Sequence, residues 1–272
     1  MLLRHRGLYA PGYEPIVDRA GPNADILMDF GVLTLRGGEE WSSGEADEKA
    51  FLLISGEVEL SWPGGAARAA RASLLDESPS VLSLAAGAWA RIVAGAGGAV
   101  LAVIRTDNAK PFPSRFYGGA ECRSEERGKG TLREASTRIV RTCFDDSDAP
   151  LSNLVLGEVV NAPGKWSSYP PHHHPQPEIY HYRLLPSAGF GLARVGEEAY
   201  LVRDGDTILI RSGQDHPMVA APGYAMWYLW VIRHLDGKRY ANPDFAFEHL
   251  WTTQAGARIW VAPSERAGGV IR

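Results

Sequence analysis

The chain has 272 residues, of which 45% are hydrophobic and 22% are charged, and its formal net charge is −4. This length favours two domains of roughly 100–150 residues each. The composition is that of a globular protein with enough apolar residues for a sizeable core. The pI of about 6.1, together with the lack of a lysine- and arginine-rich block, excludes nucleic acid as an expected partner.

The sequence indicates neither secretion nor insertion into a membrane. The N-terminal residues contain no apolar segment long enough for a signal peptide. No run approaches the roughly 18 apolar residues that span a bilayer. The two cysteines, Cys122 and Cys143, form no Cys-x-x-Cys pair, so neither a disulfide framework nor a zinc ribbon is expected. Cys143 is expected to be buried as a small apolar residue, and the protein is expected to be cytoplasmic.

The first part of the chain is predicted to be an irregular arm followed by a β-domain. Residues 1–24 are rich in glycine, proline and charge, and residues 25–109 contain short apolar runs separated by turn residues such as Ser55-Gly56 and Pro63-Gly64-Gly65. The predicted strands are Ile26–Phe30, Gly31–Leu35, Lys49–Ile54, Glu57–Trp62, Val81–Leu84, Trp89–Val93 and Val100–Arg105. Residues 110–135, with prolines, glycines and a charged run, are expected to connect this domain to the next.

A second series of strands follows in residues 136–272. The predicted strands are Thr137–Cys143, Asn153–Val160, Ile179–Leu184, Gly189–Val195, Glu198–Arg203, Thr207–Ile210 and Ala225–Arg233, and Phe245–Trp251 is helix-like. Short strands at this spacing predict an all-β protein built from sandwiches or barrels. Both halves share a strand–glycine–strand rhythm, which suggests duplication of one domain. Because residues 26–105 contain no histidine, only the second domain could hold a histidine metal site, and the first is expected to stabilise it or an oligomer.

Four of the eight histidines lie within residues 172–181. Because side chains alternate along a strand, His172 and His174 would point the same way, with His173 on the opposite face. Two prolines then turn the chain, and Glu178 opens the next strand, where it can face the same point. A further donor, His216, follows an apolar strand and a glycine turn.

Three imidazoles and one carboxylate suit a single divalent transition metal. Zn is the first expectation, with Mn, Fe, Co or Ni as alternatives. His173 and His181 are each one residue out of phase with the donors and are expected to lie outside the ligand set. Asp215, beside His216, is expected either to orient that ligand or to cap a turn.

The spacing of these donors resembles the two metal-binding motifs of the cupin superfamily. The motifs read His172-x-His174-x₃-Glu178 and Gly205-x₅-Arg211-x-Gly213-x₂-His216, with Arg211 where cupins often have proline. Longer segments are similar to the 5-deoxy-glucuronate isomerase family, bicupins of bacterial inositol catabolism related to the uronate ketol-isomerases of pectin degradation. These segments are Gly164–His172, Glu178–Arg183, Glu126–Gly130, Gly157–Val159 and Trp227–Val231. One departure is the segment between His174 and Glu178, which is shorter than the acidic loop expected there.

The resemblance implies an all-β bicupin, two cupin barrels in tandem, with the metal in residues 136–272. It implies isomerisation of 5-deoxy-D-glucuronate to 5-dehydro-2-deoxy-D-gluconate by metal-assisted proton transfer between C2 and C1. The partner is then a small-molecule uronate, and assembly into a homo-oligomer stays open. The alternatives are a cupin Fe(II) dioxygenase and a non-catalytic sugar-binding or regulatory cupin.

Roles for individual side chains are also expected. Tyr182 is the first choice for the general base, and Glu178 is the second. Substrate contacts are expected from Lys165, Tyr180, Arg183 and Arg233. Each has a plainer interpretation, since the tyrosines could simply fill the barrel and the basic side chains could face solvent. Trp227 and Trp230 are expected in the core.

Overall fold

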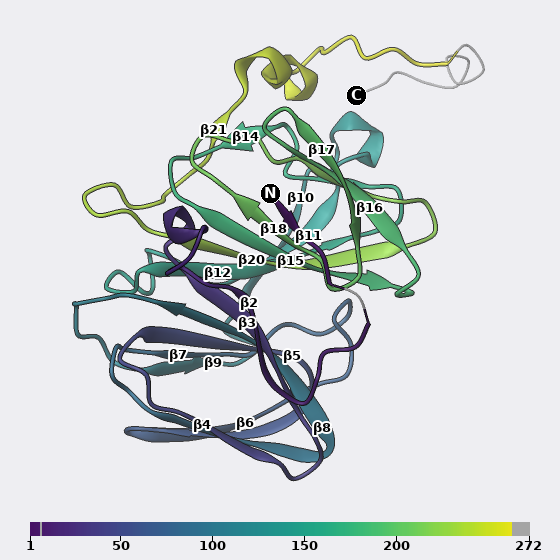
Figure 1. Ribbon diagram of the computed structural model, residues 1–272. Coiled ribbons are helices and arrows are strands. Elements are labelled where there is room, and N and C mark those ends of the chain that lie inside the picture. The colour runs from purple at the N-terminus through teal and green to yellow at the C-terminus, as the bar shows by residue number, and fades with distance from the viewer. Residues whose placement is uncertain (6, 263–272) are drawn as a thin grey trace.

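The computed structural model describes residues 1–5 and 7–262, and consists of two β-domains stacked on each other (Figure 1). The N-terminal domain forms the lower half of the view and the C-terminal domain the upper half. Helical structure in the described residues consists of three short 3₁₀ segments: η1 (Ala24–Ile26), η2 (Leu132–Glu134) and η3 (Phe247–Thr253). Within the described part of the chain, no helix has the length and apolar character needed to cross a membrane.

The N-terminal domain is an eight-stranded antiparallel sheet folded on itself. Its main path has the order β2-β3-β8-β5-β7-β9, while β4 pairs with β8 and β6 pairs with β5. The strands are β2 (Gly12–Val17), β3 (Asp29–Leu35), β4 (Glu40–Ser43), β5 (Glu48–Trp62), β6 (Gly65–Arg71), β7 (Val81–Leu84), β8 (Ala90–Thr106) and β9 (Arg115–Tyr117).

Strands β5 and β8 are longer than the sequence predicts, since each joins two predicted strands into one. The predicted turn at Ser55-Gly56 is wrong, because β5 runs through it as one strand. Gly56 has a φ of +91°, and the pairing of β5 with β8 shifts register on both sides of it. This is a bulge, which bends a strand without ending it. The turn at Pro63-Gly64 is confirmed, since Trp62 pairs with Gly65 across the β5–β6 hairpin.

The C-terminal domain contains a seven-stranded sheet, a four-stranded sheet and a two-stranded ribbon. Their orders are β1-β18-β15-β20-β12-β11-β10, β13-β19-β16-β17 and β14-β21. The strands are β1 (Leu2–Leu3), β10 (Arg123–Arg127), β11 (Arg138–Phe144), β12 (Leu154–Asn161), β13 (Trp166–Ser167), β14 (His172–His173), β15 (Glu178–Leu185), β16 (Phe190–Val195), β17 (Glu198–Arg203), β18 (Thr207–Ile210), β19 (Met218–Ala220), β20 (Ala225–Arg233) and β21 (Asp244–Phe245).

The segments expected to be irregular also contain strands. Within residues 1–24, β1 pairs with β18 of the C-terminal domain and β2 pairs with β3 of the N-terminal domain. Within residues 110–135, β9 pairs with β7 and β10 pairs with β11, so each domain gains one strand. These strands form because distant strand edges are available for pairing, which no local pattern of residues reveals.

The apolar residues form three cores, one inside each domain and one between them. Along β5, Phe51 and Leu53 face the N-terminal interior, whereas Leu52 and Ile54 face the interface. Along β15, Tyr180 and Tyr182 face the C-terminal interior, while Ile179 faces the interface. Strands buried on both faces read as continuous apolar runs, which accounts for the sequences of β12, β15 and β20.

A buried ionic cluster also ties the two domains together. The carboxylate of Glu158 on β12 is fully buried. Its Oε1 accepts from Arg71 of β6 at 2.7 Å and from Arg141 of β11 at 2.8 Å. Its Oε2 accepts from the indole nitrogen of Trp227 at 2.9 Å. The cluster therefore satisfies a charge in the interface that would otherwise be costly to bury.

Candidate metal centre

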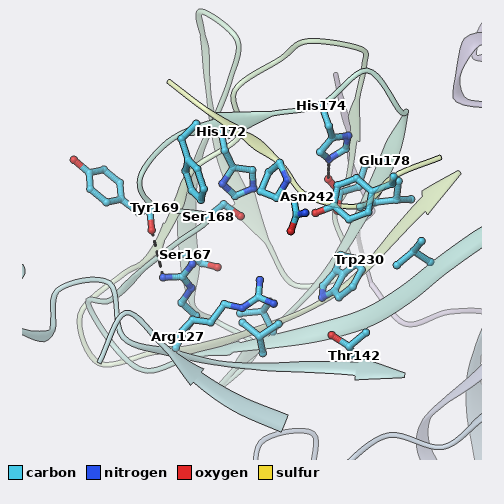
Figure 2. A pocket seen from close by; sticks show the side chains of 18 of the residues that line it. Arg127, Thr142, Ser167, Ser168, Tyr169, His172, His174, Glu178, Trp230 and Asn242 are labelled. Atoms are coloured by element: carbon cyan, nitrogen blue, oxygen red, sulfur yellow. Dashed lines mark hydrogen bonds and ion pairs between the residues drawn. The ribbon is translucent and has the colours of Figure 1, made fainter. Parts of the chain in front are cut away.

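Three of the expected donors converge inside the C-terminal domain. The ligand atoms of His174, Glu178 and His216 all lie within 4.8 Å of one another, and all three residues are buried. Glu178 Oε2 lies 3.1 Å from His174 Nε2 and 3.4 Å from His216 Nε2. Figure 2 shows His172, His174 and Glu178 along one wall of a cavity, with Arg127 and Thr142 on the opposite wall.

The backbone places these donors from three separate segments. Glu178 is the first residue of β15 and lies between Ile210 of β18 and Ile232 of β20. His216 follows a turn at Gly213, whose φ of +75° favours glycine. The amide of Gly213 donates to the carbonyl of His174 at 3.0 Å. That hydrogen bond holds the two histidine segments side by side.

Backbone carbonyls orient the imidazoles toward the centre. Nδ1 of His174 lies 2.9 Å from the carbonyl of Gln176, and Nδ1 of His216 lies 2.8 Å from the carbonyl of Gln214. A proton on Nδ1 leaves Nε2 with a free lone pair, and this arrangement is typical of metal-bound histidine. Nε2 of His216 is buried and has no hydrogen-bond partner. A divalent cation would satisfy that atom, so the donor set fits a metal ion.

His172 lies at the edge of this group. Its ring centroid is 4.7 Å from that of His216, and its Nδ1 lies 3.3 Å from the carbonyl of Pro170. Burial lowers the pKa of both His172 and His216 to about 4. Both imidazoles are therefore neutral at pH 7, which is the form that binds metal. The structure thus brings three of the four expected ligands together and puts the fourth beside them.

The histidines expected outside the ligand set lie away from the centre. Nδ1 of His173 contacts Asp215 Oδ1 at 2.9 Å, so Asp215 pairs with His173 and does not orient His216. His181 is on the opposite face of β15, where its ring packs 5.2 Å from that of Phe30 in the interface between the domains. The alternation of side chains along the strands therefore separates the donors from their neighbours.

The donors open into a cavity of about 770 Å³, a size in the range of small-molecule sites. Tyr180 lines it, as expected for a substrate contact, and its hydroxyl lies 3.3 Å from that of Ser168. Trp230 packs against the core of the C-terminal domain, as expected, but it is only partly buried and also lines the cavity. Trp227 and Cys143 are buried, as expected.

Four other expected site residues do not line the cavity. The hydroxyl of Tyr182 donates to the sulfur of Met218 at 3.4 Å, deep in the domain core. Lys165 donates to the carbonyl of Glu134, Arg183 pairs with Asp204, and Arg233 pairs with Asp107 near the interface between the domains. These placements do not support the roles expected of Tyr182, Lys165, Arg183 and Arg233. The alternation of side chains predicts which face of a strand a residue occupies, but not whether that residue lines the cavity or lies deeper in the core.

Several cavity residues were not anticipated. Arg127 and Arg138 come from β10 and β11, and Tyr228 and Tyr240 from β20 and the segment after it. The hydroxyl of Tyr228 bonds to that of Ser167, and burial raises the pKa of Tyr228 to about 12. Tyr240 packs against His174 with ring centroids 5.0 Å apart. The charged run around Arg127 is typical of a solvated strand, so only the resemblance of Glu126–Gly130 to the isomerase family marks this segment in the sequence.

Comparison with known proteins gives a consistent assignment. The sequence model of the KduI/IolB family matches residues 2–252. The 5-deoxy-glucuronate isomerase of Geobacillus thermodenitrificans is 33% identical over 147 residues, 48% of this chain and 52% of the relative. That of Halalkalibacterium halodurans is 25% identical over 246 residues, 84% of this chain and 89% of the relative. The chain thus spans about half the length of the first of these relatives and most of the second.

Solved structures share the fold. An IolB-like protein from Salmonella typhimurium superposes with a TM-score of 0.78 at 23% identity, covering 90% of this chain and 96% of that one. The oxalate decarboxylase of Lactobacillus farciminis superposes with a TM-score of 0.64 at 12% identity, covering 91% and 88%. At these identities the likeness concerns the fold alone. The predicted all-β bicupin fold is confirmed.

Proposed function

Because the chain belongs to the KduI/IolB family, we propose that it interconverts 5-deoxy-D-glucuronate and 5-dehydro-2-deoxy-D-gluconate, an aldose and a ketose uronate. Matching relatives bear the name 5-deoxy-glucuronate isomerase. The observation that carries the proposal is the buried convergence of His174, Glu178 and His216 in a cavity of suitable size. Such a donor set suits an isomerase that needs a Lewis acid and no redox cofactor.

The proposed cofactor is one divalent transition metal, with Zn as the first candidate. His174, Glu178 and His216 would hold it, and His172 would be the fourth ligand. A bound divalent ion supplies Lewis-acid polarisation of a carbonyl oxygen, which makes the neighbouring C–H more acidic. The carbonyls of Gln176 and Gln214 keep the imidazoles in the tautomer that this role requires.

The protein's own groups must move a proton between C2 and C1. Glu178 is the carboxylate of the donor group, and its Oε2 makes the contacts to both histidines. Its second oxygen, Oε1, makes neither contact, so we assign to Oε1 the removal and return of the proton. Tyr182 is not assigned this role, because its hydroxyl faces Met218 in the core.

Tyr180 and Tyr228 would orient the sugar. Both side chains are buried and line the cavity, and burial raises the pKa of each. They therefore remain protonated at neutral pH and can donate hydrogen bonds to sugar oxygens. The wall that they form also restricts access of water to the reacting carbons.

The test is to incubate metal-replete protein with 5-deoxy-D-glucuronate without oxygen and to follow ketose formation. We expect conversion by the wild type and its loss in His174→Ala and His216→Ala, together with loss of bound metal measured by elemental analysis. Treatment with a chelator should abolish activity, and adding the metal back should restore it. Turnover that requires oxygen would instead favour an Fe(II) dioxygenase. Binding without any conversion would favour a sugar-binding protein.

A further inference from the structure

Two arginines face each other directly across β10 and β11. Arg127 and Arg138 are paired in the register of these antiparallel strands, and both line the cavity. Like charges directly opposite each other destabilise a sheet. The pair therefore weakens the fold locally unless an anion lies close to both guanidinium groups.

The two guanidinium groups differ in how they are satisfied. Arg127 is exposed and pairs with Glu125 through Nε at 2.7 Å and Nη2 at 2.6 Å. Arg138 has no carboxylate partner among the described residues. Its Nη1 donates to the carbonyl oxygens of Ser136 at 2.8 Å and Tyr169 at 3.4 Å, and its Nε is buried without a hydrogen-bond partner. Burial lowers the pKa of Arg138 below its usual range, as expected of a desolvated cation without a counter-ion.

The segment before the first histidine links Arg138 to the metal centre. The carbonyl of Tyr169 accepts from Arg138, and the carbonyl of Pro170 lies 3.3 Å from Nδ1 of His172. The arginine wall and the histidine wall thus face the same space (Figure 2). In an extended six-carbon uronate, the carboxylate carbon lies roughly 6 Å from the aldehyde carbon, given bonds of about 1.5 Å. Because Arg138 and His172 contact the carbonyls of two adjacent residues, Tyr169 and Pro170, a sugar of this length is of the right scale to reach from one wall to the other.

We propose that Arg138, assisted by Arg127, forms the subsite for the carboxylate of a uronate whose other end lies at the metal centre. This assignment rests on the proposed function. A guanidinium presents parallel N–H donors that match a carboxylate geometrically. The other basic residues expected for this role are engaged elsewhere, since Arg183 pairs with Asp204 and Arg233 pairs with Asp107.

The experiment measures equilibrium binding to metal-replete protein by calorimetry. The probes are 5-deoxy-D-glucuronate and 5-deoxy-D-glucose, which carries a neutral hydroxymethyl group in place of the carboxylate. The wild type should prefer the acid, and Arg138→Met should lose that preference by roughly ten- to a hundredfold, the effect of a charge-assisted hydrogen bond. Arg138→Lys should retain part of the preference, and metal content should be unchanged in both variants.

Two further variants guard against misfolding and nonspecific charge effects. Arg127→Met removes an exposed side chain, should fold normally and should reduce the preference by a smaller factor. Arg91→Met removes the same charge from an exposed ion pair with Glu40 in the N-terminal domain, and should bind both sugars as the wild type does. If Arg138→Met does not fold, Arg138→Lys and Arg127→Met still decide the outcome.

The possible outcomes separate this inference from the proposed isomerase activity. A wild type that converts the acid, with the preference unchanged in the Arg138 and Arg127 variants, overturns the subsite and leaves the activity standing. A preference that depends on Arg138, without conversion by the wild type, supports the subsite and contradicts the isomerase. A wild type that binds neither sugar overturns both.

Discussion

At the scale of single residues, the orientation of each imidazole is set by a carbonyl two positions away in the chain. His172 is held by Pro170, His174 by Gln176 and His216 by Gln214. A backbone acceptor cannot be removed by substitution and does not titrate, so it fixes the tautomer over a wide range of pH. The donors are therefore preorganised, which lowers the entropic cost of binding an ion.

The contribution of His172 to metal affinity can be measured by comparison with His173, its neighbour in the chain. Removing a residue that hydrogen-bonds to a metal ligand reduces metal affinity by roughly 10–100-fold, so His172→Ala, which would remove the proposed fourth ligand itself, should reduce it by at least as much. His173→Ala is the matched control, since that imidazole pairs with Asp215 outside the centre, and its affinity should be unchanged. Competition with a chelating dye would report both affinities. Equal affinities in the two variants would show that His172 is not a ligand.

The donors could be predicted from the sequence, but most of the cavity wall could not. His174, Glu178 and His216 were predictable because strand alternation and spacing act over short stretches of chain. The proposed role of Arg138 was not predictable, because it depends on β11 lying beside β10 and on the contact with the carbonyl of Tyr169, and no local sequence pattern specifies either. Tyr182 illustrates the limit of alternation, which correctly gave its face yet could not show that it lies in the core next to Met218.

At the scale of elements, β12 joins the two domains through its central carboxylate. Glu158 contacts one arginine from each domain and the indole of Trp227. Charges buried this completely are tolerated only when all partners are present. The strand therefore depends on β6, β11 and β20 for its polar contacts as well as for packing.

Glu158→Ala should lower the free energy of unfolding by about 3–5 kcal/mol, because it leaves Arg71 and Arg141 buried without their counter-ion. Denaturation in urea, followed by tryptophan fluorescence, measures the change. Glu40→Ala removes a carboxylate from an exposed ion pair with Arg91 and should have little effect. A similar, small change in both variants would contradict the structural importance of the cluster.

The elements were predictable to different degrees. Apolar runs located the cores of β5, β8, β15 and β20, because a strand buried on both faces needs such a run. The full length of β5 was not predictable, because a glycine such as Gly56 can indicate either a bulge within a strand or a turn that ends it. The short strands β1, β9 and β10 carry no sufficient pattern of their own and exist through their partners.

At the scale of the whole molecule, the apolar interface makes the two domains interdependent. His181 lies within it, fully buried, with Nδ1 3.0 Å from the hydroxyl of Thr207 and its ring near Phe30. Burial lowers the pKa of His181 to about 3, compared with about 6.5 in an unfolded chain. Between these values the unfolded chain binds a proton that the folded protein does not.

Stability should therefore fall as the pH decreases below about 6.5, by up to about 1.4 kcal/mol per pH unit from this group. His181→Gln removes the titrating group, so its unfolding free energy should depend less steeply on pH between 6.5 and 5. Partly exposed His249→Gln serves as the control and should follow the wild type. Urea denaturation at several pH values provides the comparison. Parallel curves for all three proteins would refute a depressed pKa for His181.

The interface between the domains also affects the nascent chain during synthesis on the ribosome. The N-terminal sheet is complete in sequence once β9 has been made, but its outward face, which includes Leu52, Ile54 and Ile104, packs against Ile179, Trp227 and other residues made later. A nascent chain that has not reached β20 thus carries an uncovered apolar sheet face, the kind of surface through which partly folded chains aggregate. The N-terminal sheet therefore cannot bury this face until the domain that holds the donors has been synthesised.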